Sequence, residues 1–304
     1  MAATTAGVAS RDFGRVLAQR ERRFATLLLA PAFLALMVTT TFPLLFLVYT
    51  SAYRIDLAMP FANGFVGFEN YSVLLQDSRF WQSLVISLVY TVSTVILQVV
   101  IGLALALFVM DMKRGQGWFR LIAILPVVLS PAVVGMIWRT FMLAPEFGIV
   151  DYLAISAGLG SKNWLGDPTL AMISVIVIHT WQWTPFAFMV LLASLAALPD
   201  DIYEAARIDR ASAWQRFRRI TLPLLRPAIV MVIIMRTMVA LTAFAAIFTV
   251  TGGGPGTATE ILNLYAYRKS FTELSIGYGS ALAVALLIFT IIISAILFAM
   301  RRSK

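Results

Sequence analysis

The chain has 304 residues, of which 60% are hydrophobic and 13% are charged, and its formal net charge is +9. A soluble domain is about half apolar and about one quarter charged, so this composition indicates a protein whose solvent is lipid. The basic residues lie at the ends of apolar runs, which argues against nucleic-acid binding, and the absence of cysteine excludes disulfides and thiolate metal sites.

Six apolar runs are long enough to cross a membrane, since roughly 20 helical residues span about 30 Å of hydrocarbon. The predicted fold class is therefore all-α, a polytopic membrane protein with six transmembrane helices. Residues 1–23 form a tail, residues 24–300 the transmembrane domain, residues 199–226 a loop on the same side as the tail, and residues 301–304 a second tail. The predicted spans are residues 24–50, 81–110, 120–141, 170–198, 227–250 and 276–300.

The distribution of Lys and Arg predicts the orientation. Seventeen basic residues fall in the two tails and the second and fourth loops, whereas five fall in the other loops. Basic residues favour the cytoplasmic side, so both termini and the loop 199–226 are expected there. On the opposite side, the turn residues Gly64, Gly67 and Asn70 and several aromatic residues predict a small folded cap over about residues 52–80.

The loop of residues 199–226 has the pattern of two short helices. The segments Asp201–Glu204 and Ser212–Gln215 are both capping-box patterns, which predict a helix start at each. We expect a bend between the two helices near Arg210, and we expect Pro223 to end regular helix before the next span.

Apolar side chains predict a ridge along each of these helices. Ala205, Ile208 and Ala211 share a face of the first helix, and Trp214 and Phe217 share a face of the second, which we expect to pack against the spans. The pair is open to two interpretations, a docking element for a protein or a surface pair stabilised by lipid headgroups. An anionic leaflet would repel the acids of the first helix, which are Asp200, Asp201, Glu204 and Asp209.

This loop resembles the EAA motif of ABC importer permeases, which is roughly EAA, three residues, Gly, a longer gap and then I-x-LP. Glu204–Ala206 and Ile220–Pro223 match, whereas Arg210 stands where the family usually has Gly. If the bend needs a positive φ, a non-Gly residue there costs about 1 kcal/mol. The resemblance implies a type I ABC importer permease fold and a coupling helix that docks into a groove on an ATPase subunit. The implied coupling residues are Glu204, Ala205, Ala206, Arg207, Asp209 and Arg210.

Three further segments resemble the carbohydrate branch of these permeases, which includes maltose-type, glycerol-phosphate-type and sugar-alcohol permeases. They are Trp183–Phe186 ahead of Leu195–Pro199, Thr251–Gly256 followed by Thr259–Glu260, and Gly277–Ala281. The resemblance covers roughly residues 25–300 and implies a bacterial inner-membrane importer of a sugar, polyol or related solute. Implied partners are a second homologous permease, two ATPase subunits that hold ATP and Mg, an extracytoplasmic solute-binding protein and membrane lipid. It implies no cofactor on this chain.

Polar residues within the predicted spans are candidates for a solute path, because buried polar groups are costly in a bilayer. Aromatic faces stack on sugar rings, and amide groups bond hydroxyls. The candidates are His179, Trp181, Gln182, Trp183, Arg236, Thr242 and Phe244. Structural roles remain open alternatives: Arg236 would pair with carbonyls or a partner's Glu, His179 would bond a neighbouring helix, and the tryptophans would form an interfacial belt.

Absent patterns separate the functional alternatives. No acid lies within the predicted spans, which argues against a proton- or sodium-coupled carrier. No P-loop, H-E-x-x-H or G-x-S-x-G pattern is present, so we expect no catalytic or metal-ligating residues and place ATP hydrolysis on a separate chain. A stand-alone carrier or channel for a small polar solute is the alternative function. A lipid-modifying enzyme is disfavoured by the single histidine.

Overall fold

The computed structural model describes residues 24, 26 and 28–302, and this part is mostly helical. Five of its helices are long and apolar enough to cross a membrane, and a bent pair makes up to six. The five are Leu28–Ser51, which contains η1 (Met37–Thr41) and α2 (Phe42–Ser51), then α4 (Ser78–Asp111), α8 (Pro168–Ala196), Ala213–Leu241, which ends in α11 (Leu222–Leu241), and α14 (Ile276–Arg302). The predicted tail 1–23 and residues 303 and 304 lie outside the described residues.

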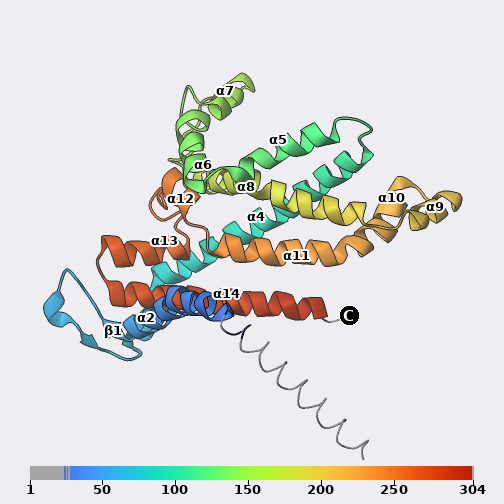
Figure 1. The fold of residues 1–304 in the computed structure, drawn as a ribbon. Coiled ribbons are helices and arrows are strands. Elements are labelled where there is room, and N and C mark those ends of the chain that lie inside the picture. Colours follow the sequence, from blue (N-terminus) through green and yellow to red (C-terminus); the bar gives the residue numbers. More distant parts are fainter. Residues whose placement is uncertain (1–23, 25, 27, 303–304) are drawn as a thin grey trace, which may run out of the picture.

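The long helices run between two ends of the molecule. Figure 1 shows α4, α8, α11 and α14 between an end with the strand β1 (Tyr53–Arg54) and an end with α9 (Asp200–Ile208) and α10 (Ala213–Arg216). The C-terminal end of α14 lies toward the α9 end (Figure 1). Loops therefore lie at the bundle ends, where their backbone groups reach water.

The close packing of α4 on α8 depends on a glycine. A Cβ atom at Gly102 would lie 2.9 Å from both the Cβ of Ala187 and the backbone nitrogen of Phe188. Only glycine fits at that distance, and small residues at a helix crossing are typical of membrane bundles. Around the crossing, Ala106, Ala187, Phe188 and Leu191 are fully buried. This part of the core therefore joins the two helices closely.

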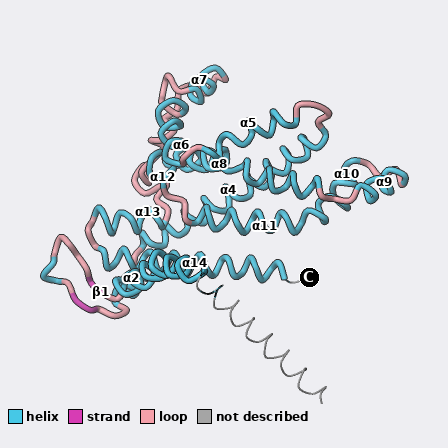
Figure 2. The backbone as a smooth tube through the Cα atoms, viewed as in Figure 1, coloured by secondary structure: helices cyan, strands magenta, loops and turns pink. Residues whose placement is uncertain are grey.

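The third predicted span, residues 120–141, is not one straight helix. It consists of α5 (Gln116–Val128), then α6 (Pro131–Ile137) with η3 (Trp138–Met142), and the two parts meet at 95°. Pro131 disfavours helical backbone at the residue before it, and Ser130 is accordingly extended, with φ −60° and ψ 135°. Figure 2 shows the resulting break between α5 and α6.

The fifth predicted span, residues 227–250, is also not one continuous helix. Helix α11 ends at Leu241, and α12 (Ala245–Val250) begins after a break at which Phe244 has φ −145° and ψ −63°. The Nδ2 atom of Asn263 lies 3.1 Å from the carbonyl oxygen of Thr242 and donates to it, so a carbonyl at the break is satisfied. The chain then returns through α13 (Leu262–Tyr267) and η5 (Arg268–Thr272).

The predicted external cap is present as a folded unit. Strand β1 pairs antiparallel with β2 (Gly64–Phe65), and η2 (Pro60–Ala62) lies between them (Figure 2). Helix α3 (Glu69–Gln76) follows, and its Asn70 side chain donates to the carbonyls of Ser51 and Tyr53. The cap is therefore fastened to the end of the first span by buried hydrogen bonds.

Candidate functional site

The first candidate surface is the helix α9, which stands at one end of the bundle. Its N-cap residue is Pro199, with no side-chain cap, so the predicted capping box at Asp201 and Glu204 is wrong. Pro199 takes an extended backbone after α8 ends, and the helix therefore starts two residues earlier than the box requires. Asp200 and Asp201 lie in the first turn instead, where their negative charge is favourable.

The bend after α9 places Arg210 in a left-handed conformation with φ 54°. The amide of Ala211 donates to the Ala206 carbonyl, and the amide of Arg210 donates to the Arg207 carbonyl. This pair of bonds is a Schellman motif, whose left-handed residue is usually Gly. The bend therefore has the positive φ that the sequence analysis raised for this position, and the residue that adopts it is Arg210 and not a glycine.

Helix α10 begins at the predicted second capping box, because Ser212 and Gln215 bond each other's backbone amides. The helix then continues through η4 (Phe217–Thr221) into α11, so Ala213–Leu241 is one helix. The prediction that Pro223 ends it is wrong. Pro223 lies in the first turn of α11 after a π-helical turn that already interrupts the usual bonding pattern, so its missing amide hydrogen costs little.

Most of the predicted coupling residues lie on the outside of the loop. The exposed ones are Glu204, Ala205, Arg207, Asp209 and Arg210. Ala206 is 7% exposed and faces inward, and Ile208 is 81% exposed. Tyr203 Oη lies 2.9 Å from Thr221 Oγ1, which ties α9 to η4. Helix α9 therefore presents a charged face with two exposed isoleucines, Ile202 at 39% and Ile208, and its base is held by the bond from Tyr203 to Thr221. Trp214 is 66% exposed, so the expectation that it packs against the spans is wrong.

The second candidate site is a polar cluster inside the bundle. Arg236 on α11 is 2% exposed, and its Nε donates to Gln98 Oε1 on α4 at 2.7 Å. Its Nη2 lies 3.1 Å from His179 Nε2 on α8, and its guanidinium lies 4.4 Å from the centre of the Trp183 ring. The structure therefore joins three of the predicted path residues, His179, Trp183 and Arg236.

The hydrogen bonds of this cluster assign the histidine tautomer. A guanidinium only donates, so His179 Nε2 accepts from Arg236 and carries no proton. Nδ1 of the neutral ring then donates to the Tyr90 hydroxyl oxygen. No carboxylate in the described part of the chain forms an ion pair with Arg236. The cluster is therefore a buried positive charge held by neutral partners.

The other predicted path residues belong to different groups. Gln182 is 1% exposed and donates through Nε2 to the Leu129 carbonyl at 3.0 Å, at the break between α5 and α6. Trp181 is 41% exposed and packs edge-on against Trp138, with ring centres 5.7 Å apart. Thr242 is exposed at the end of α11.

Phe244, at the break between α11 and α12, begins a row of aromatic rings. Its ring centre lies 5.2 Å from that of Phe248 and 5.0 Å from that of Tyr267, and the Tyr267 ring lies 5.2 Å from that of Phe271. Phe248 and Phe271 are exposed. Rings of this kind offer apolar faces on which a sugar could stack.

Gln98, Tyr90 and most of this aromatic row were not predicted from the sequence. Gln98 carried a usable signal, because it is the only amide side chain between residues 84 and 110. Tyr90 and the aromatic row carried none, because an aromatic residue in an apolar run is ordinary. Their contacts join residues far apart in the sequence.

Two buried carboxylates, Glu260 and Asp151, hold together loops outside the long helices. Glu260 is 0% exposed and accepts from Arg79 Nε at 2.7 Å and from Arg268 Nη1 at 2.5 Å. Asp151 on α7 (Ile149–Ser156) is also 0% exposed. It accepts from four groups, the Ser161 hydroxyl, the Trp164 indole and the amides of Lys162 and Glu146. The Ser161 hydroxyl and the other donors hold the pKa of this carboxyl well below its usual range.

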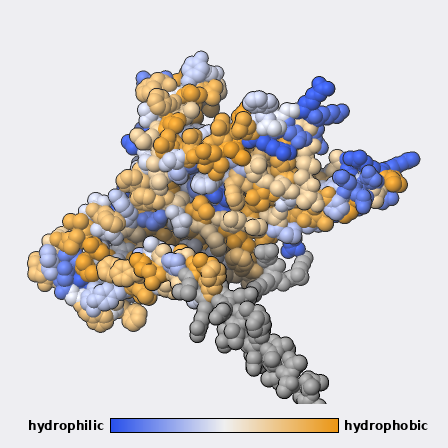
Figure 3. Space-filling view, viewed as in Figure 1, coloured by the Kyte–Doolittle hydropathy of each residue, from blue (hydrophilic) through white to orange (hydrophobic). Residues whose placement is uncertain are grey.

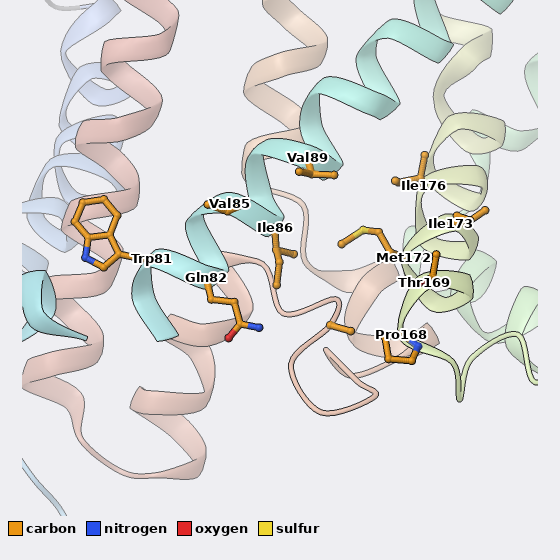
Figure 4. A pocket seen from close by; sticks show the side chains of 11 residues that line it. Trp81, Gln82, Val85, Ile86, Val89, Pro168, Thr169, Met172, Ile173 and Ile176 are labelled. Atoms are coloured by element: carbon orange, nitrogen blue, oxygen red, sulfur yellow. The ribbon is translucent and has the colours of Figure 1, made fainter. Parts of the chain in front are cut away.

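A groove of about 800 Å³ lies between the first turns of α4 and those of α8 (Figure 4). Its lining is apolar apart from Gln82, Thr169 and Trp81, and the Trp81 indole already donates to the Leu75 carbonyl. It therefore offers few partners to the hydroxyls of a polyol. The groove suits an apolar occupant.

Long apolar helices around a buried cation, with a short charged helix extended from one end, are features of an integral membrane protein. Residues 98–303 match the family described as binding-protein-dependent transport system inner membrane component, and the chain belongs to this family. It is 33% identical to the trehalose/maltose transport system permease protein MalF of Thermococcus litoralis, over 91% of this chain and 92% of that protein. It is 35% identical to the sulfoquinovosyl glycerol transport system permease protein SmoG of Agrobacterium fabrum, over 93% of this chain and 92% of that protein.

A solved structure has the same fold. The chain is similar to one chain of a bacterial ABC transporter involved in the import of the acidic polysaccharide alginate, with a TM-score of 0.82 and 22% identity. The match covers 95% of this chain and 100% of that chain. The predicted type I permease fold is confirmed.

Proposed function

We propose that this chain is one transmembrane subunit of an ATP-driven, binding-protein-dependent importer for a sugar, polyol or related carbohydrate. The observation that carries the proposal is the family membership together with the printed substrates of its relatives, trehalose/maltose and sulfoquinovosyl glycerol. The protruding helix α9, fastened by Tyr203 and ended by the bend at Arg210, supports a coupling role for the loop.

The partners follow from the same proposal. A second homologous permease would complete the path, two ATPase subunits would hold ATP and Mg, and an extracytoplasmic binding protein would deliver the solute. Helix α9 would dock on an ATPase subunit through Glu204, Ala205 and Arg207, with Ile208 as an apolar contact. Both termini and this loop would lie in the cytoplasm of a bacterium, with the cap outside its inner membrane.

The proposed solute path uses Arg236 with its neighbours His179 and Trp183, and the further path residues Trp181, Gln182, Thr242 and Phe244. The buried cation and the aromatic faces support this assignment, because a path for a polar solute needs polar groups shielded from lipid.

Reconstitution tests the proposed function. The chain is inserted into liposomes with and without the proposed second permease, ATPase and binding protein, and uptake of labelled sugars is measured. We expect uptake and solute-stimulated ATP hydrolysis only with the full set. Uptake by the chain alone would contradict the proposal and support a stand-alone carrier. Reporter fusions after Lys162 and after Arg216 should read outside and inside respectively.

A further inference from the structure

The loop between α8 and α11 divides into two halves of opposite charge. Residues 199–210 contain four acids and two arginines, a net charge of −2. Residues 211–226 contain no acid and four arginines, which are Arg216, Arg218, Arg219 and Arg226. Figure 3 shows hydrophilic side chains over the end of the molecule where α9 and α10 lie. The two halves therefore suit different neighbours.

The basic half forms a hollow of about 370 Å³ on the first turns of the helix Ala213–Leu241. Its four lining residues are Trp214, Gln215, Arg218 and Arg219. Trp214 and Arg218 are four residues apart, as are Gln215 and Arg219, so the four side chains form two adjacent pairs on one helix surface. The Trp214 ring packs against Phe217, with ring centres 5.5 Å apart, which fixes one wall of the hollow.

The two arginines of the hollow have no protein partner. Arg218 and Arg219 are exposed, and neither forms an ion pair or a side-chain hydrogen bond within the described residues. Arg216 differs, because its Nη1 donates to the Ala211 carbonyl at 3.3 Å. Two free guanidinium groups beside an indole form a site for a phosphate group, which arginine binds through paired N–H donors.

The same helix continues directly into the apolar candidate span that ends at Leu241. Leu222, one turn beyond Arg218, is 37% exposed, and Leu224 is 41% exposed. An occupant of the hollow would therefore have a charged group at the arginines and an apolar portion along the leucines. Tryptophan and arginine are also the residues that proteins place at the headgroup layer.

From this arrangement we propose that Trp214, Gln215, Arg218 and Arg219 bind the phosphate of an anionic phospholipid. The acyl chains of the lipid follow α11 toward Leu222. The lipid anchors the basic half of the loop at the membrane surface, while the acidic half, α9, stays free for a protein partner. The inference adds a lipid site to the proposed function and depends only on the site itself, not on the solute or the ATPase.

The test measures lipid binding by the full chain in neutral detergent. Phosphatidylglycerol is titrated, with phosphatidylcholine of the same acyl chains as reference, and bound lipid is counted by native mass spectrometry. The variant R218Q/R219Q should bind phosphatidylglycerol about 30-fold more weakly, given the attraction of two arginines to an anionic lipid surface. The matched control K113Q/R114Q removes the same charge from another exposed loop at the same end and should bind like the unaltered chain.

Further variants and a competitor distinguish a lipid site from a site for free phosphate and from a protein interface. R218K/R219K keeps both positive charges but lacks the paired N–H donors, so it should bind the lipid more strongly than R218Q/R219Q and more weakly than the unaltered chain. Inorganic phosphate in 100-fold excess should not displace the lipid, and displacement would overturn the lipid assignment in favour of a free phosphate compound. Equal lipid binding by R218Q/R219Q and K113Q/R114Q would overturn the proposal. So would unchanged lipid binding with loss of ATPase association, since the arginines would then belong to a protein interface.

Discussion

The Nε atom of Arg236 lies 2.7 Å from Oε1 of Gln98, and this hydrogen bond joins α11 to α4 inside the bundle. The same guanidinium reaches His179 on α8, so one side chain connects three long helices. The stability of the folded protein depends strongly on each neutral partner of this buried charge, because removing one partner leaves a buried donor without an acceptor.

Replacing Gln98 by Leu should destabilise the protein by about 2 kcal/mol, because the buried Arg236 Nε loses its hydrogen-bond acceptor. Adding Arg236→Met should recover part of that loss, since the charge that needs the acceptor is gone. Thermal unfolding of the full chain in detergent measures both. The control is Gln82→Leu, an exposed amide on the same helix, which should change stability by less than about 0.5 kcal/mol. Strictly additive effects of the two substitutions would contradict the proposed dependence.

Glu204→Lys combined with Ala205→Trp should uncouple ATP hydrolysis from solute uptake in the complex. Both side chains are exposed on α9, so the substitutions reverse a charge and block close approach without disturbing the interior. Ala205 is the better position than Ala206, which is buried. We expect solute-stimulated ATP hydrolysis and uptake to fall at least about tenfold, corresponding to a loss of about 1.4 kcal/mol or more, while the two permeases still assemble. Asp111→Lys, at an exposed site at the end of α4, is the matched control. Normal uptake by the double variant would show that α9 is not the coupling element.

Arg210→Gly should stabilise the bend after α9 by about 1 kcal/mol, because Arg210 has φ 54° and glycine adopts this conformation without steric cost. Limited proteolysis of residues 199–226 measures the effect as a slower cleavage rate. Arg207→Gly is the contrasting variant, because Arg207 lies within α9 and glycine inside a helix is destabilising by about 1 kcal/mol. Faster cleavage of the Arg210→Gly variant would mean that the arginine side chain itself holds the bend.

The Asp151 carboxylate should make the stability of the loop between η3 and α8 depend on pH at the acid end. Its pKa is lowered in the folded protein, chiefly by the Ser161 hydroxyl, so its contribution is present above the unfolded pKa of about 4 and is lost as pH falls toward the folded value. Asp151→Asn should therefore unfold the loop more easily at pH 7, and the difference from the unaltered chain should shrink below about pH 4. Hydrogen exchange of residues 143–167 measures this. Glu146→Gln, exposed in the same loop, should show no such difference. A gap that stays constant down to pH 2 would refute the assignment.

The sequence predicted the fold class and the approximate positions of the spans, because apolar length and the distribution of charge follow directly from the bilayer. It did not predict the breaks at Ser130 and Phe244. Pro131 gave a signal for the first, and only the fold reveals the second, since the backbone at Phe244 departs from helix where the chain turns toward α13.

Some parts of the candidate sites were predicted from the sequence and others were not. Ser212 and Gln215 formed the expected cap because a capping box depends on residues three apart, whereas the box at Asp201 was displaced by the way α8 ends. His179 and Arg236 were found from the cost of polar groups in lipid. Their contact with Gln98 depends on the packing of three helices, which local pattern alone does not specify.

The continuity of Ala213–Leu241 has a mechanical consequence. A helix of 29 residues is about 44 Å long, so a tilt of about 5° around one end moves the other end by about 4 Å. Arg236 lies near the far end of this rod and the bend at Arg210 lies just before its start. A small rocking of the loop would therefore displace the buried guanidinium relative to Gln98 and His179 by about the length of a hydrogen bond, enough to exchange one set of partners for another.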